Sequence, residues 1–233
     1  MEITNAIRVG GQRKDAGIWH EKDKEYFKEY QAPIMEKMHG GHWTNINSTI
    51  TFYGPMLYFI IRALGCEKVL EIGAAKGYTG RYMAHAIKDN AARYGMKDNI
   101  YYGIDIVSTE WLSAQMFKED LPAKIINMDS KKLNPQTFEG IKFDLIFQDG
   151  AHDTEHVLHE LDVLYPQLKG QGRGYWIFHD CYGPAEEGFQ ELKKMIEKGK
   201  YKFEYVRLLS VYGIAILRKT EGEDPGKKYW YLK

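Results

Sequence analysis

Short apolar runs alternate with longer helical patterns from Lys68 onward. Five of these runs are typical of buried strands, namely KVLEIG at 68–73, IYYGIDI at 100–106, AKIINMD at 123–129, FDLIFQDG at 143–150 and GYWIFHD at 174–180. Apolar residues at helical spacing predict helices at 78–94, 152–168 and 185–198. Strands that alternate with helices of this length predict a parallel sheet covered on both faces.

The last two apolar runs differ because only a short connection separates them. FEYVRLL at 203–209 and YGIAILRK at 212–219 leave no room for a crossover helix, so we expect an antiparallel hairpin. The expected fold is therefore α/β, a doubly wound, mostly parallel seven-stranded sheet with a C-terminal antiparallel hairpin.

Three segments make up the predicted domain organisation. Residues 1–50, with one helix at about 22–38, form an N-terminal helical cap, and residues 51–220 form the main domain. A second apolar helix, at 54–64, leads into the first strand, and residues 221–233 are a polar, then aromatic, tail. The cap and tail carry apolar surface, which favours a homodimer or larger assembly.

Composition excludes several classes of protein. The 32 Lys and Arg residues balance the 32 Asp and Glu residues, so no net field attracts nucleic acid. The first residues lack the apolar stretch of a signal peptide, and the run MLYFIIRALG, interrupted by Arg62, is too short to cross a bilayer. Cys66 and Cys181 offer no disulfide framework. We expect a cytoplasmic protein without nucleic-acid or membrane partners.

A glycine-rich turn, VLEIGAAKGYTG, joins the first strand to the helix after it. A nicotinamide site needs G-x-G-x-x-G, but Ala75 stands in place of the second glycine, and the next glycine is Gly77. The wider turn suits a ligand without a pyrophosphate. Glu71 can hold an ammonium group, directly or through water, and the amides near Gly73 suit a carboxylate. An amino acid joined to adenosine has both groups, although such a turn can also lack any ligand.

Acidic residues stand at the ends of the following strands. Asp105 lies 32 residues after Gly73, where a carboxylate can accept hydrogen bonds from both hydroxyls of a ribose. Asp129 is placed to reach the exocyclic amine of an adenine, and Asp149 ends the fourth strand. Each acid alone is equally consistent with a solvated carboxylate. Acids at matching positions on several strands make a common ligand the better interpretation.

From about Ser48 to Lys219 the chain resembles the class I S-adenosylmethionine-dependent methyltransferases, including the reversed terminal hairpin. DLIFQDGAHDTEHVLHELDVLYPQL and GYWIFHD resemble, more narrowly, the macrocin O-methyltransferase type and the related cephalosporin-hydroxylase-like proteins. The resemblance implies a Rossmann-like fold, S-adenosyl-L-methionine as cofactor, and a sugar or phenol as acceptor. We expect cofactor contacts from Glu71, Gly73, Ala74, Gly77, Asp105, Ile106, Asp129, Ser130 and Asp149, and from Asn45 and Ser48 of the cap.

Strands four and five are neighbours in this family, so the tips that carry Asp149 and Asp180 should lie about 5 Å apart. The two carboxylates would then share a divalent cation such as Mg²⁺, which lowers the pKa of a substrate hydroxyl. His152 stands three residues after Asp149, where the macrocin-type enzymes have a residue that resembles a general base.

His179 departs from the family pattern, which commonly has a second acid at this position. A nitrogen ligand shifts the preferred metal toward Mn²⁺, Fe²⁺ or Zn²⁺. His179 could equally act as the base of a metal-independent methyltransferase. A cephalosporin-hydroxylase-like protein and a non-catalytic S-adenosylmethionine-binding subunit remain further alternatives.

Three histidines have a spacing that looks like a metal site. His152, His156 and His159 are separated by four and three residues, so in a helix they share one face. That face lies opposite the apolar stripe that includes Leu161, and therefore points away from the sheet. We do not expect a zinc site there.

Overall fold

The computed structural model describes residues 50–107, 110–208 and 213–222 of the chain. The elements follow in the order α3 (Ile50–Leu64), β1 (Lys68–Ile72), α4 (Tyr78–Tyr94), β2 (Ile100–Asp105), α5 (Glu110–Lys118), β3 (Ala123–Asn127), η2 (Ser130–Lys132), β4 (Leu145–Gln148), α6 (Thr154–Leu164), η3 (Tyr165–Gln167), β5 (Tyr175–His179), α7 (Glu186–Glu197), β6 (Phe203–Leu208) and β7 (Ile214–Lys219). None of the helices in these ranges is long and apolar enough to cross a membrane.

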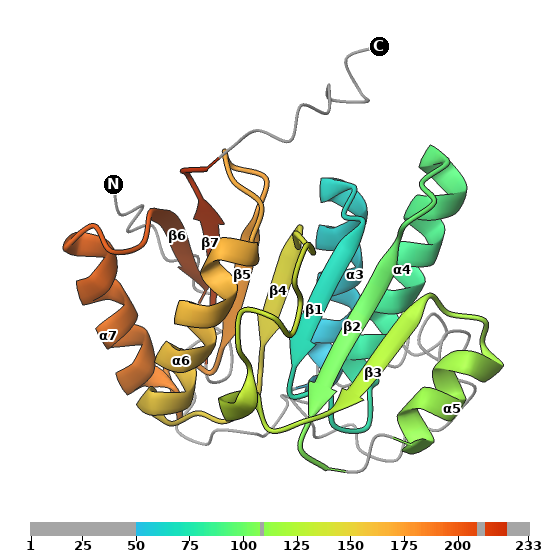
Figure 1. Ribbon diagram of the computed structural model, residues 1–233, viewed down its shortest axis with the longest axis horizontal. Helices are drawn as coiled ribbons and strands as arrows, with labels where there is room; N and C mark the ends of the chain where they lie inside the picture. The colour runs from blue at the N-terminus through green and yellow to red at the C-terminus, as the bar shows by residue number, and fades with distance from the viewer. Residues whose placement is uncertain (1–49, 108–109, 209–212, 223–233) are drawn as a thin grey trace, which may run out of the picture.

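The strands form one seven-stranded sheet in the order β3-β2-β1-β4-β5-β7-β6 (Figure 1). All neighbours from β3 to β5 are parallel, whereas β7 is antiparallel to both β5 and β6. The predicted doubly wound sheet and its C-terminal hairpin are thereby confirmed. The chain reverses its direction of winding between β1 and β4, and in such sheets the crevice outside the strand ends at this point binds ligands.

Helices cover both faces of the sheet (Figure 1). Leu70 and Ile146 belong to the core under α6 and α7, whereas Val69 and Phe147 belong to the core under α3, α4 and α5. Because successive side chains of one strand enter opposite cores, the central strands carry apolar residues on both faces rather than on alternate positions, and Glu71 and Gln148 are buried polar exceptions. Burial of both strand faces explains why the sequence predicts these strands from short, mostly apolar runs.

Several element boundaries differ from the prediction. The predicted helix at 152–168 is divided, because Asp153 caps α6 through a hydrogen bond from the His156 backbone amide (3.1 Å) and Pro166 lies in the 3₁₀ turn that follows. The helix expected at 54–64 begins at Ile50, and α5 was not predicted. The predicted helix at 22–38 lies outside the described residues, and the three-part division of the chain stays a prediction.

Candidate functional site

The turn after β1 needs glycine for two physical reasons. Gly73 and Gly77 have φ values of 89° and 73°, in the left-handed region that favours glycine. A Cβ on Gly73 would overlap the carbonyl oxygen of Asp149, and a Cβ on Gly77 would overlap the side chain of Leu112. The amides of Gly73 and Ala74 donate to the Ile104 carbonyl at 2.9 and 3.0 Å. The turn is thus held between β2 and the tip of β4.

Glu71 lies beneath this turn with no exposed surface. Thr79 and Tyr101 each donate a hydrogen bond from a hydroxyl to one of its carboxylate oxygens. Burial raises the pKa of Glu71 to about 8, although both hydrogen bonds lower it. In this structure the carboxylate supports the turn from inside. The contact with an ammonium group that the sequence indicated stays a prediction.

Asp105 ends β2 and is bonded to the same turn. Its Oδ2 accepts from the Ala75 amide at 2.6 Å, and its Oδ1 accepts from the Val107 amide at 2.8 Å. Ile106, the next residue, exposes 68% of its surface. A half-buried carboxylate beside an exposed apolar side chain suits a ribose and an adjoining flat ring.

Asp129 and Ser130 form the turn after β3. Asp129 caps η2 by accepting from the Lys131 amide at 3.0 Å, and its Oδ1 lies 3.7 Å from His156 Nε2 of α6. Ser130 is buried, with 8% of its surface exposed. The turn therefore lies between the edge strand β3 and the start of α6.

The tips of β4 and β5 bring together two acids and a histidine. His179 Nδ1 donates to Asp149 Oδ1 at 2.7 Å and lies 3.0 Å from Asp180 Oδ1. One possible ligand atom from each residue lies within 4.8 Å of the others. Asp180 has φ 59°, a conformation that Asp, Asn and Gly tolerate best. Asp149 and Asp180 therefore lie close together, as expected for the tips of neighbouring strands, because β4 and β5 pair in parallel.

His179 is enclosed by aromatic rings and by the two acids. The Tyr53 ring of α3 meets its imidazole edge-on at 4.6 Å, and the Phe147 ring lies 6.1 Å away. Burial lowers the pKa of His179, but the hydrogen bonds and charges of Asp149 and Asp180 outweigh it and raise the pKa to about 9. Its buried Nε2 has no hydrogen-bond partner within the described ranges.

His152 approaches the same acids from the outside. It precedes α6, and its Nε2 lies 3.2 Å from Asp180 Oδ2. Its side chain exposes 36% of its surface, against 3% for His179. His152 is therefore the imidazole of this cluster that an incoming molecule can reach.

The expectation that His152, His156 and His159 share a helix face is wrong, because α6 begins only after His152. His156 Nδ1 pairs with Asp153, and His159 Nε2 lies 3.0 Å from the Leu133 carbonyl. The three rings thus have different partners. Within the residues that the structure describes, the only metal-like group of His, Cys, Asp and Glu is Asp149, His179 and Asp180.

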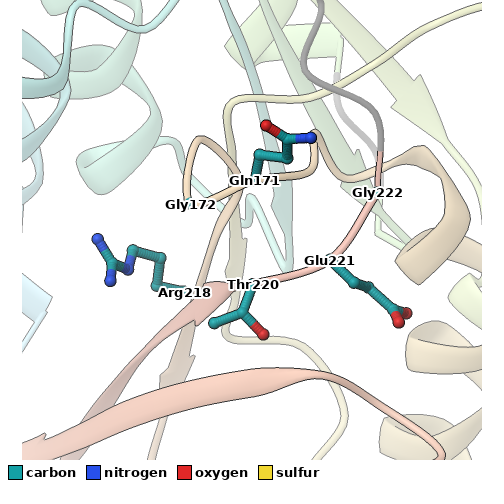
Figure 2. A pocket seen from close by; sticks show the side chains of 6 residues that line it. All are labelled: Gln171, Gly172, Arg218, Thr220, Glu221 and Gly222. Atoms are coloured by element: carbon teal, nitrogen blue, oxygen red, sulfur yellow. The ribbon is translucent and has the colours of Figure 1, made fainter.

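An open pocket of about 540 Å³ lies at the strand ends away from the candidate site, where β5 begins and β7 ends (Figure 2). It is lined by Gln171, Gly172, Arg218, Thr220, Glu221 and Gly222. The Arg218 guanidinium is paired with Glu204. None of the predicted site residues lines this pocket, so we do not assign it to the candidate site.

The sequence did not reveal the side chains that support the site from behind. Thr79 and Tyr101 hold Glu71. For Thr79 there was one signal in the sequence, its position in the first turn of the helix that follows the glycine turn. Asn45 and Ser48 lie outside the described residues.

Comparison with known proteins identifies a family for part of the chain. Residues 70–181 match the model of a family described as a methyltransferase domain. Residues 70–181 are a methyltransferase domain. The expectation of a methyltransferase is thereby confirmed for these residues. No curated protein matches the chain by sequence.

Solved structures share the fold of this chain at low sequence identity. Cofactor-bound Rv0187 from MTB is 13% identical with a TM-score of 0.65, covering 91% of this chain and 100% of that one. The O-methyltransferase TomG from Streptomyces achromogenes, in complex with SAM, is 12% identical with a TM-score of 0.63, covering 90% and 100%. An O-methyltransferase from Bacillus cereus, in complex with SAH, is 12% identical with a TM-score of 0.62, covering 86% and 98%. Likeness at this identity shows the fold alone.

Proposed function

We propose that the protein transfers the methyl group of S-adenosyl-L-methionine to a hydroxyl of a small molecule, such as a sugar or a phenol. The observation that carries the proposal is the position of Asp149. Its backbone carbonyl packs against Gly73 of the glycine turn, and its side chain belongs to the acid and histidine cluster. A methyl donor held by the turn would thus lie beside the groups that can deprotonate an acceptor.

The cofactor would lie across the tips of β1, β2 and β3. The proposed contacts are Glu71, Gly73, Ala74, Gly77, Asp105, Ile106, Asp129, Ser130 and Asp149, with Asn45 and Ser48 from the preceding segment. Asp105 supports this placement, because the hydrogen bond from the Ala75 amide to its Oδ2 (2.6 Å) fixes its carboxylate at the turn. The exposed side chain of Ile106 offers an apolar surface to the adenine.

The reaction is an in-line displacement, so the protein must orient the acceptor oxygen and remove its proton. We assign proton removal to His152, since its side chain is the more exposed of the two imidazoles and its Nε2 lies 3.2 Å from Asp180 Oδ2. The Asp180 carboxylate would stabilise the imidazolium that forms. His179 holds its own proton toward Asp149 and is buried, so it suits a positioning role better than a basic one.

A divalent cation fits the same cluster. Asp149 and Asp180 would supply carboxylate oxygens, and His179 could add a nitrogen, since one possible ligand atom from each lies within 4.8 Å of the others. Bound there, a cation would lower the pKa of the acceptor hydroxyl. The mixed donor set suits Mn²⁺ or Fe²⁺ as well as Mg²⁺.

Metal-independent transfer is the second candidate, and one observation favours it. The imidazole of His179 already donates to Asp149 and approaches Asp180, and the two acids raise its pKa to about 9. A protonated His179 would therefore place a positive charge between Asp149 and Asp180, in the role that the cation would otherwise have. His152 would remain the base in this version.

Calorimetric titration with S-adenosylhomocysteine and, separately, with NAD tests the cofactor. Transfer of a labelled methyl group to a panel of sugars, phenols and nucleosides, with and without chelator, then tests the reaction and the metal. Binding of NAD alone would refute the proposal. Binding of S-adenosylhomocysteine without transfer to any acceptor would favour the non-catalytic subunit, and a reaction that consumes oxygen would favour the cephalosporin-hydroxylase-like alternative.

A further inference from the structure

Glu160 is a buried carboxylate in the middle of α6. None of its surface is exposed, and its helix neighbours Val157 and Leu161 belong to the apolar core between α6 and the sheet. Burying a carboxylate among apolar side chains costs free energy unless hydrogen bonds compensate it. Packing of the helix on the sheet would be served as well by an apolar residue, so this position requires another explanation.

A chain of hydrogen bonds joins Glu160 to the two strands that carry the acid cluster. Trp176 Nε1 of β5 donates to Gln148 Oε1 of β4 at 2.9 Å, and Gln148 Nε2 donates to Glu160 Oε2. Gln148 and Trp176 are also buried, with 3% and 0% of their surface exposed. Gln148 immediately precedes Asp149, so this hydrogen bond joins α6 to the tip of β4 at the residue before the site acid.

The same carboxylate lies on α6, the helix that packs against η2 in the turn after β3. Burial raises the pKa of Glu160 to about 7, although the nearby Ser130 side chain and the hydrogen bond from Gln148 lower it. Glu160 Oε1 has no partner with full hydrogen-bond geometry within residues 50–107, 110–208 and 213–222. The carboxylate therefore keeps one acceptor beside Ser130, the first residue of η2.

We propose that Glu160 is a positioning residue of the cofactor site, which holds the Asp129–Ser130 turn in a fixed place relative to the tip of β4. This inference rests on the proposed function, because these two segments are where the adenine and the methyl-bearing part of the cofactor would lie. Glu160 itself is buried and acts through Ser130 and Gln148. A turn that is already fixed before binding loses less conformational freedom when the ligand arrives.

The test is calorimetric titration of the full-length protein with S-adenosylhomocysteine, together with the unfolding temperature of each variant. Glu160→Met removes the carboxylate and should weaken binding about tenfold. Glu160→Gln can still accept from Gln148 and donate to Ser130, so its affinity should remain within about threefold of wild type. The matched control is Asp162→Asn on the same helix, since Asp162 pairs with Lys200 and Tyr201 and should leave affinity unchanged.

A double-mutant cycle separates positioning from direct contact. If Glu160 acts through Ser130, adding Ser130→Ala to Glu160→Met should weaken binding less than the sum of the single effects. Additive effects, or wild-type affinity in a folded Glu160→Met variant with a lowered unfolding temperature, would overturn the proposal.

Should Glu160→Met not fold, Glu160→Asp takes its place, because the shorter side chain cannot reach both partners. Wild-type affinity in that variant would also overturn the proposal. Failure of the proposed function looks different, since the wild-type protein would then give no binding heat, and this inference would fall with it.

Discussion

Replacing Glu71 by glutamine should change how the stability of the protein depends on pH. The side chain releases its proton near its ordinary pKa of 4.5 in the unfolded chain but at about 8 in the folded protein. Between these values the folded state binds more protons, so the free energy of unfolding falls as pH rises. The stabilisation is fully present below 4.5 and is lost as pH rises through about 8. At 1.36 kcal/mol per pH unit, this one group lowers the unfolding free energy by about 3 to 4 kcal/mol between pH 5 and pH 8.

The assay is denaturant unfolding of wild type and Glu71→Gln at pH 5, 6, 7 and 8. All other titrating groups are common to both proteins, so the difference between their unfolding free energies isolates Glu71. We expect the variant to gain stability relative to wild type at each step upward in pH. Glu139→Gln, a change at an exposed acid, is the control and should give parallel curves. A wild-type minus Glu71→Gln difference that stays constant within about 1 kcal/mol would refute a buried carboxylate that ionises on unfolding.

Three further predictions concern the site. Asp105→Ala should weaken S-adenosylhomocysteine binding by about 1 to 3 kcal/mol in calorimetry, through lost hydrogen bonds to a charged group; unchanged affinity would remove the ribose from this strand end. His152→Ala should lower turnover by about a hundred- to ten-thousand-fold while cofactor and metal binding persist. Full activity in that variant, with loss of activity in His179→Ala, would make His179 the base. Asp149→Asn or Asp180→Asn should lower metal affinity and turnover together, whereas turnover that survives both chelator and these changes would establish metal-independent transfer.

The sequence was sufficient for the strands and the turn, because the physical cause of each is local. In β1 and β4, Leu70 and Ile146 enter one core while Val69 and Phe147 enter the other, and only a sheet covered on both sides requires apolar residues on both faces of a strand. Gly73 and Gly77 adopt the left-handed backbone that their residue type indicates. The sequence did not indicate α5, whose nine residues bury Leu112 and Met116 but expose 88% of Phe117.

Contacts between distant segments could not be predicted in the same way. Tyr101 reaches Glu71 from the next strand along the chain, and Glu160 reaches Gln148 from a helix. Each of these contacts depends on strand register and side-chain rotamer, which composition and spacing do not encode. The place of His152 depends on one cap, since Asp153 delays the start of α6 and leaves the preceding imidazole free to turn toward Asp180.

The pairing of β1 with β4 has a consequence for how the protein folds and for how fast it is degraded. Val69 pairs with Leu145, so this junction closes a loop that contains β2 and β3, and contacts of such separation form slowly. The glycine turn belongs to the half of the chain before this junction, and the acid cluster belongs to the half after it. A donor that touches both Gly73 and Asp149 would bind only the joined form and stabilise it by mass action. Proteolysis of the transiently opened chain would then slow as the methyl donor becomes abundant, which couples the lifetime of the protein to the supply of its own substrate.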